Sequence, residues 1–477
     1  MNLNGDLNYE KKALKALLGS DDIIFFDFET GGNQALCVYV DSITDKETLG
    51  LEVIAPLSKN EDDKPVSSLA KKINLANVKT ETELSKIVDN VLSGHAVILV
   101  DGKKKAICVD LKKFEVRAIS EPPTGVAVKG PRNGFTESIK SNLSLIRRYL
   151  RSSDLKVEMF EKGKYTKTAI AFMYIDGIAP RQLIEKVRKK IEAINVDGIP
   201  DSSYVSKLLN ERKTSLFKQV GSTERPDVLI ERMLEGRVGV IVDGSPFCLS
   251  LPYLLIEDFQ AAEDYYISPY RANLVRMLRV ISILFSILLP AIFVAAQLFH
   301  LQIIPLNFLL TIVNGIKEIP FSPSLEMFFV LLIFEILNET SVRMPKYVGM
   351  ALAVVGALVL GETAVNAGVV STPAILIMAL SGISIYAIPE LVETSSVLRF
   401  VYLIIAGSLG GYGLILLSCF IVCYLCVSDN YGAPYVAPYS PIILNDLQDG
   451  LYMNNVIGMT KRPESLGSNN KIRQKLK

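Results

Sequence analysis

Four glutamates lie within the most apolar part of this chain, and they limit what the chain can fold into. The segment 319–362 is hydrophobic over most of its length, yet it contains Glu326, Glu335, Glu339 and Glu362. Three long runs without charged residues accompany it, at 280–316, 363–389 and 400–428. About 20 apolar residues in a helix are enough to cross a bilayer. Because a carboxylate is costly in such a setting, these four side chains are candidate functional residues.

The region 271–428 therefore predicts a transmembrane helical domain with four to six hydrophobic segments. Arginines precede the first run, and positive residues favour the cytoplasmic side. Residues 301–316 are apolar but short, which favours a re-entrant or interfacial segment, and 400–427 is expected to be the last span. An odd number of spans would place the C-terminus outside, whereas the basic end of the chain favours the inside. The sequence therefore does not decide on which side of the membrane the C-terminus lies.

Glu335, Glu339 and Arg343 are spaced four residues apart and share one face of a helix. In one interpretation this helix lies at the membrane interface, and its charges are solvated or paired, Glu339 with Arg343. In the other, an oligomer arranges the carboxylates around a water-filled path, where they favour cations. The sequence is compatible with both arrangements.

A stripe of small residues follows, in which every fourth residue is Gly or Ala: Gly349, Ala353, Ala357 and Gly361. Small residues at this spacing let a second helix approach closely, so the stripe predicts a helix-packing face. The alternative is that small residues are scattered by chance along a lipid-facing helix.

The first half of the chain contains an internal repeat. Residues 227–244 (DVLIERMLEGRVGVIVDG) echo residues 87–102 (IVDNVLSGHAVILVDG), and both read as a helix, a strand and a turn. The fold class expected is two related α/β subdomains followed by an α-helical membrane domain. The boundaries expected are a first subdomain at 1–125, a basic helical linker at 126–154, a second subdomain at 155–270, and a polar, partly disordered tail at 429–477.

Nothing in the sequence indicates catalysis. There is no phosphate-binding loop, nucleophile elbow or metal-ligand motif, so we expect neither an enzyme nor a cofactor or metal site. A net charge of +1 gives no case for nucleic-acid binding. Four aspartates at predicted strand ends fit turns, or else a ligand cleft between the subdomains: Asp41, Asp101, Asp176 and Asp243.

Several long stretches resemble one known family. They are KGPRNGFTESIKSNLSLIRRYL (129–150), TERPDVLIERMLEGRVGVIVDGSPFCLSLP (223–252), and the whole of 319–373, with GAPYVAPYSP after the last apolar run. On these stretches the chain resembles the A subunit of the GerA-type spore germinant receptors, from about residue 120 to 441.

The resemblance implies an integral protein of the inner membrane of bacterial spores, with its N-terminal domain in the cytoplasm. It implies two partners, a transporter-like B subunit that senses the nutrient and a C-subunit lipoprotein. It also implies a homo-oligomer, with a pentamer as the expected state, that forms a ligand-gated cation channel. Two alternatives remain: a related spore membrane channel that amplifies germination without sensing a nutrient, and a secondary transporter. A transporter would be expected to show inverted repeats in its membrane half.

Overall fold

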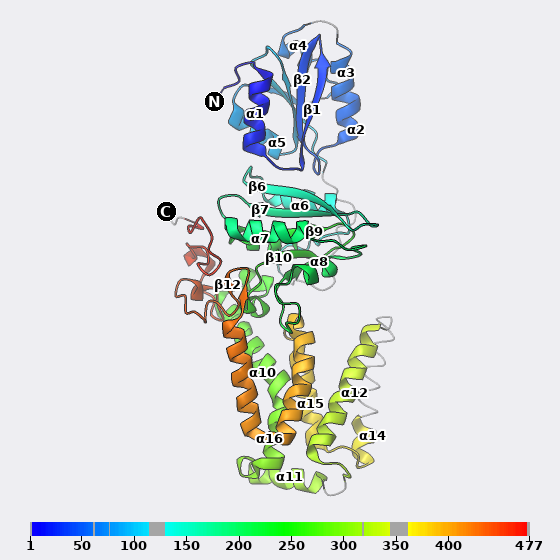
Figure 1. The fold of residues 1–477 in the computed structure, drawn as a ribbon, viewed down its shortest axis with the longest axis vertical. Coiled ribbons are helices and arrows are strands. Elements are labelled where there is room, and N and C mark those ends of the chain that lie inside the picture. Colours follow the sequence, from blue (N-terminus) through cyan, green and yellow to red (C-terminus); the bar gives the residue numbers. More distant parts are fainter. Residues whose placement is uncertain are drawn as a thin grey trace. The chain divides into compact units, whose positions relative to one another are not determined.

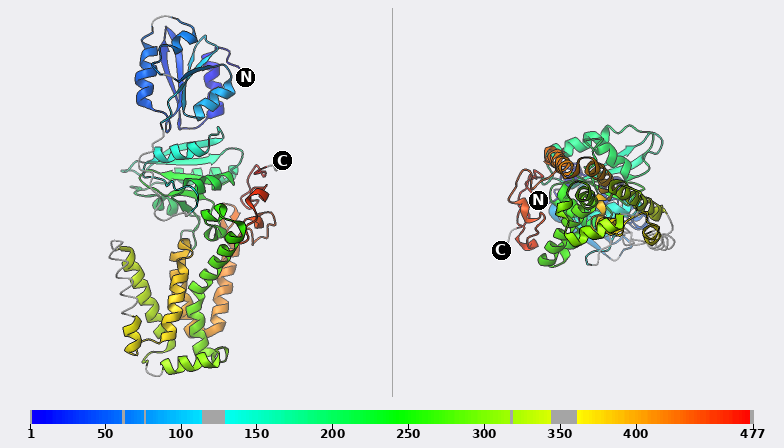
Figure 2. Two further views of the ribbon diagram at one scale, coloured as in Figure 1. Left: turned by 180° about the vertical axis from the view of Figure 1, so that it is seen from behind. Right: turned by 90° about the horizontal axis from the view of Figure 1, so that it is seen from below.

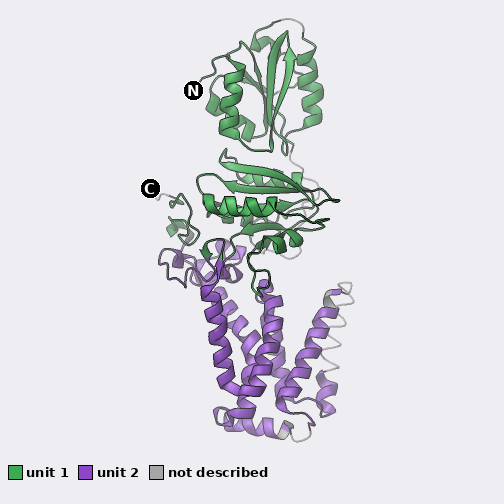
Figure 3. Ribbon diagram, viewed as in Figure 1, with its two compact units in different colours: residues 1–253, 430–433, 456–477 green, residues 254–429, 434–455 purple. Residues whose placement is uncertain are grey.

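The computed structural model describes residues 2–60, 63–75, 77–113, 129–316, 319–343 and 361–474. These residues form two compact units, coloured separately in Figure 3. Unit 1 contains Met1–Tyr253, Asn430–Ala433 and Val456–Lys477, and unit 2 contains Leu254–Asp429 and Pro434–Asn455. The N-terminal boundary of the helical unit therefore lies after Tyr253, not after residue 270 as the sequence predicts. Residues 254–266 belong to unit 2 because they bond to its C-terminal segment, for example through Leu255 N and Tyr435 O.

The first subdomain of unit 1 is an antiparallel sheet between two helical layers. The strand order is β1-β2-β4-β5-β3. Figure 1 shows α1 and α5 on one face of the sheet, and α2 and α3 on the other. The elements are α1 (Leu7–Leu18), β1 (Ile23–Thr30), β2 (Asn33–Val40), α2 (Lys46–Thr48), the π-helix η1 (Leu49–Ile54), α3 (Ala55–Ser58), α4 (Val66–Ala70), β3 (Val78–Glu81), α5 (Leu84–Leu92), β4 (His95–Val100) and β5 (Ala106–Asp110).

Strand alternation explains why both faces of this sheet are covered. In β2, Leu36 and Val38 pack against α1 and α5, whereas Ala35 and Cys37 pack against the opposite layer. Successive side chains of a strand point to opposite faces, so a strand that is apolar at every position requires a layer on each side.

The second subdomain repeats this architecture, with the strand order β6-β7-β9-β10-β8. Helices α6 and α9 cover one face, and α7 and α8 cover the other. The elements are α6 (Ile139–Tyr149), β6 (Leu155–Lys162), β7 (Thr168–Ile175), α7 (Arg181–Glu192), α8 (Ser202–Leu209), β8 (Gly221–Thr223), α9 (Pro226–Leu234), β9 (Val238–Val242) and β10 (Cys248–Leu251). The two repeated sequence stretches thus occupy equivalent places, as α5–β4 and α9–β9.

Two of the repeated aspartates hold helix starts. Asp101 Oδ1 accepts a hydrogen bond from the backbone N–H of Leu7, the first residue of α1, at 3.1 Å. Asp243 Oδ1 accepts the corresponding bond from Ile139, the first residue of α6, also at 3.1 Å. A carboxylate at a helix N-terminus satisfies a free N–H and suits the helix dipole. Helix α6, which the sequence places in a linker, therefore corresponds to α1 and packs in the core of the second subdomain.

Arg147 of α6 is almost fully buried and bonds to the first subdomain. Its Nε and Nη2 donate to the two carboxylate oxygens of Asp22, both at 2.7 Å. It also donates to the carbonyls of Ser152 and Leu155 and to the Ser20 hydroxyl. A two-pronged arginine–carboxylate pair fixes orientation as well as distance.

Unit 2 is built mainly from helices. Its elements are the 3₁₀ turns η2 (Leu255–Phe259), η3 (Ala262–Tyr266), η4 (Leu301–Ile303) and η6 (Pro389–Leu391), with helices α10 (Pro269–Phe299), α11 (Leu306–Ile316), α12 (Pro323–Arg343), α14 (Gly361–Asn366), α15 (Thr372–Ile385) and α16 (Val392–Val427). Among the described residues, two segments are long and apolar enough to cross a membrane by length and composition, Pro269–Phe299 and Pro389–Val427. Figure 1 shows α11 lying across the end of the bundle.

Helix α16 is a helical hairpin and not one continuous rod. Gly410 has non-helical angles, φ 59° and ψ −147°, and the Tyr402 hydroxyl lies 2.9 Å from the Ser418 hydroxyl. In a straight helix, sixteen residues would separate these two positions by about 24 Å. The 400–428 run, expected as a single span, therefore turns back at Gly410, and its second half runs beside α10 (Figure 2).

The turn at Gly410 predicts a specific cost of substitution. A Cβ at Gly410 would approach the Phe299 ring to 2.7 Å, in a backbone conformation that L-residues rarely adopt. We expect Gly410→Ala to destabilise the helical unit by about 1–3 kcal/mol, measured as a lower unfolding temperature of the detergent-solubilised protein. The control is Gly315→Ala in α11, since the described atom nearest to a Cβ there, outside α11, is the Cβ of Ser371 at 3.7 Å, an ordinary contact distance. Equal unfolding temperatures for the two variants would contradict the hairpin turn.

The C-terminal segment, for which the sequence predicts an extended and partly disordered tail, is packed against both units. Tyr431 and Leu466 are buried in unit 1, and Tyr435 and Met453 are buried in unit 2. Aromatic and aliphatic residues spaced through a polar segment give it enough apolar area to be held by folded partners.

Candidate functional site

A proline in α10 starts a chain of contacts that crosses the interior of the helical unit. Pro290 has no N–H, so the carbonyl of Ser286, four residues earlier, loses its usual helical partner. The Ser381 hydroxyl of α15 donates to that carbonyl at 2.7 Å, and both serines are fully buried. A neighbouring helix thus satisfies the backbone group that the proline frees.

The next contact is aromatic. Gly382 follows Ser381, and a Cβ at this glycine would come within 2.4 Å of the Phe334 ring of α12. The Arg399 guanidinium of α16 also lies over that ring, with its central carbon 5.5 Å from the ring centroid. A guanidinium over an aromatic face is attracted by the ring electrons. Phe334 therefore links α15 to α16.

The chain of contacts ends in an ion pair between α12 and α16. Arg399 Nη2 donates to Glu335 Oε1 at 2.6 Å, and the hydroxyl of Ser396 donates to the same carboxylate. The Arg399 side chain is 0% exposed and that of Glu335 is 22% exposed. Because both charges lie inside a helical bundle, each is needed to compensate the other.

The other predicted residues lie in different surroundings. Glu326 is buried, and its Oε1 accepts a 2.6 Å hydrogen bond from the backbone N–H of Ser371. Glu339 forms an exposed ion pair with Arg343, and Glu362 is exposed on α14. Gly361 is described, and among the described residues no atom lies within 4 Å of a Cβ at this position. The remaining members of the small-residue stripe lie outside the described residues: Gly349, Ala353 and Ala357.

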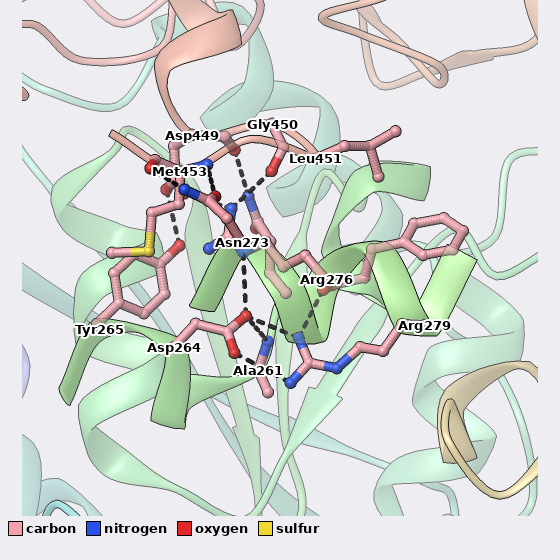
Figure 4. Close-up of polar contacts among 12 residues, drawn as sticks. Ala261, Asp264, Tyr265, Asn273, Arg276, Arg279, Asp449, Gly450, Leu451 and Met453 are labelled. Atoms are coloured by element: carbon pink, nitrogen blue, oxygen red, sulfur yellow. Dashed lines mark hydrogen bonds and ion pairs between the residues drawn. The ribbon is translucent and has the colours of Figure 1, made fainter. Parts of the chain in front are cut away.

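A second polar cluster joins the start of α10 to the C-terminal segment (Figure 4). Arg276 is fully buried, and its Nε donates to Asp264 at 3.0 Å while its Nη1 donates to Asp449 at 2.9 Å. Arg279 also bonds to Asp264, and the Tyr265 hydroxyl donates to Asp449. Asn273 exchanges two hydrogen bonds with the backbone of Met453. The beginning of α10 and residues 449–453 are therefore held at the same end of the helical unit.

The described residues contain no metal-binding cluster, and two buried thiols of unit 1 are unreactive. No group of three or more His, Cys, Asp or Glu side chains there could hold a metal ion. Burial raises the pKa of the Cys37 thiol to about 12 and, as the largest contribution, that of Cys108 to about 11. Thiols in such surroundings are inert, because the reactive form is the thiolate.

Comparison with known proteins shows which family this chain belongs to. Residues 10–465 match the family described as Bacillus/Clostridium GerA spore germination protein. The chain belongs to the GerA family. It is 36% identical to spore germination protein KA of Bacillus subtilis, over 96% of this chain and 86% of that one.

Two further similarities accompany the GerA match. The chain is 33% identical to the uncharacterized membrane protein YfkQ of Bacillus subtilis, over 95% of this chain and 89% of the relative. It is also 29% identical to the solved N-terminal domain of the A subunit of the Bacillus megaterium spore germinant receptor GerK3. That match covers 54% of this chain and 98% of the solved one, with a TM-score of 0.43.

In this GerA-family chain, the residues that sequence reasoning missed are the partners of charged side chains. In the sequence, Arg399 is recognisable only as a positive residue before the last apolar run, and Arg276 and Arg279 only as positive residues before the first. The partners Glu335 and Asp449 lie 64 and 173 residues away from Arg399 and Arg276. No local spacing rule reaches so far. A charged residue at the edge of an apolar run nevertheless indicates that an oppositely charged partner exists elsewhere in the chain, because a packed helix would otherwise bury an unpaired charge.

Proposed function

We propose that this GerA-family chain is the A subunit of a germinant receptor and that it works in the inner membrane of the spore. The match over residues 10–465 carries the proposal. We assign unit 2 to the membrane and the N-terminal subdomains to the cytoplasm. Residues 449–453 are bonded to the start of α10. These bonds support the placement of the start of α10 and of residues 449–453 on the same side of the membrane.

The proposed activity is a ligand-gated cation channel made by several copies of the chain, with five as the expected number. Its expected partners are a transporter-like B subunit and a C-subunit lipoprotein. The small-residue stripe that ends at Gly361 would let helices of neighbouring copies approach, and no described residue of the same copy lies within 4 Å of a Cβ at Gly361. Of the four candidate carboxylates, Glu339 and Glu362 are exposed, so an ion in water can reach both of them, Glu339 beside its partner Arg343.

Ion selectivity in liposomes tests this proposal. We expect the reconstituted protein to conduct cations in preference to anions. We expect the double variant Glu339→Gln, Glu362→Gln to lower that preference by roughly fivefold. The reason is that neutralising a hydrated carboxylate close to the ion removes about 1 kcal/mol of electrostatic attraction. Glu185→Gln in α7 of unit 1 is the control, because this exposed carboxylate lies outside the helical unit.

The outcomes separate the parts of the proposal. If the double variant conducts ions with unchanged selectivity, Glu339 and Glu362 do not line the ion path. An absence of ion flux in the wild-type protein, with its partner subunits present, would contradict the channel itself.

A further inference from the structure

Arg399 lies inside the helical unit with much of its hydrogen-bonding capacity unused. Its side chain is 0% exposed, and Nη2 alone bonds to Glu335. Nε and Nη1 are both buried and have no partner among the described residues. A guanidinium carries five N–H donors and no acceptor. Buried donors are almost always paired with protein or bound solvent, so these free N–H groups of Arg399 need an acceptor.

Ser395 provides a second unpartnered group one helical turn away. It is fully buried, and its hydroxyl also has no partner within the described part of the chain. Residues four apart lie on the same face of a helix, which places Ser395 and Arg399 on one face of α16. The adjacent serine, Ser396, behaves differently because its hydroxyl is bonded to Glu335.

We infer that Arg399 and Ser395 form a binding site for a small hydrogen-bond acceptor, either a water molecule or a monovalent anion such as chloride. A buried water typically has two to four polar partners. The Ser395 hydroxyl and one of the two free N–H groups of Arg399 supply two of them, since Nε–H and Nη1–H point to different sides of the guanidinium. Water adds no charge to the pair that Glu335 and Arg399 already form, whereas chloride would leave the site with one negative charge. The site is a property of the folded helical unit and does not depend on the proposed channel activity.

Thiol accessibility tests for water. The exposed cysteines are first replaced with alanine: Cys419, Cys423 and Cys426. Ser395→Cys is then compared with Ala406→Cys, which is equally buried on the same helix. In the full-length protein in lipid nanodiscs, we expect a small hydrophilic methanethiosulfonate reagent to modify Ser395→Cys on the order of tenfold faster, because only a hydrated thiol ionises readily.

Radiolytic footprinting gives the same information without a substitution. Water held at Arg399 should lead to oxidation of the Phe334 ring, which lies against this guanidinium. The Phe293 ring, buried on α10, is the internal reference and should stay unmodified.

Replacing chloride with another anion tests whether chloride, and not water, fills the site. If chloride fills the site, replacing it with gluconate at constant ionic strength will lower the unfolding temperature of the wild-type protein. The same exchange will not affect the double variant Glu335→Gln, Arg399→Gln. A chloride-independent protein with a reactive Ser395→Cys or an oxidised Phe334 identifies water. The inference is overturned if there is no chloride effect, Ser395→Cys reacts as slowly as Ala406→Cys, and Phe334 is as unmodified as Phe293.

Discussion

Replacing Arg399 with methionine will destabilise the helical unit by about 3–5 kcal/mol, the usual cost of leaving one member of a buried ion pair alone. Arg399→Met keeps an unbranched side chain of similar length, but it removes the cation that compensates Glu335 at 2.6 Å and the guanidinium that lies over Phe334. The measurement is thermal unfolding of the solubilised full-length protein.

Arg343→Met is the matched control for Arg399→Met. Arg343 also pairs with a glutamate of α12, but both partners are mostly exposed, at 79% and 64%. Exposed ion pairs contribute about 0–1 kcal/mol, so this variant should unfold close to the wild type. Adding Glu335→Gln to Arg399→Met should recover part of the loss, because no buried charge then lacks a partner. If Arg399→Met were as mild as Arg343→Met, the ion pair would not stabilise the bundle.

Arg147→Met will cause the largest loss in unit 1, again about 3–5 kcal/mol. The guanidinium is 1% exposed and Asp22 is 2% exposed, so removing the cation leaves a buried carboxylate uncompensated. Hydrogen exchange in the full-length protein is the measurement. We expect lower protection in peptides that cover α6, which contains Arg147, and β1, which begins directly after Asp22.

The adjacent residue is the control for Arg147→Met. Arg148 is exposed, and Arg148→Met should change stability by no more than about 0.5 kcal/mol. Similar exchange profiles for the two variants would show that the contact with Asp22 does not hold the subdomains together.

The duplicated half of the fold was predictable because its signals are local. The strands are apolar at alternating or successive positions. The same Asp-Gly pair follows β4 and β9, as Asp101-Gly102 and Asp243-Gly244. The role of α6 was not predictable in this way. Its sequence, IKSNLSLIRRY, shares little with LNYEKKALKALL of α1, and only the matching bonds from Asp101 and Asp243 reveal that the two helices are equivalent.

In the helical unit, the apolar runs predicted the helices but not how the chain turns. Hydropathy is the same for one long helix and for two helices joined at a glycine. The glycines of the 400–428 run allow a bend, but its hydropathy does not distinguish a single span from a reversal at Gly410. The Glu339–Arg343 pair lies four residues apart and is visible to a spacing rule. The Glu335–Arg399 pair depends on how α12 meets α16, and that contact is decided by packing of the whole bundle.

The division of the C-terminal segment between the units has a consequence for the order in which this protein is made. Tyr431 belongs to the core of the second subdomain, where its hydroxyl bonds to the Leu209 carbonyl and Asn430 bonds to the Gln219 and Tyr253 carbonyls. A ribosome completes residues 155–251 long before it reaches 430. The core of this subdomain therefore closes only after both halves of the α16 hairpin have been synthesised, so its final folding step follows the synthesis of the helical unit.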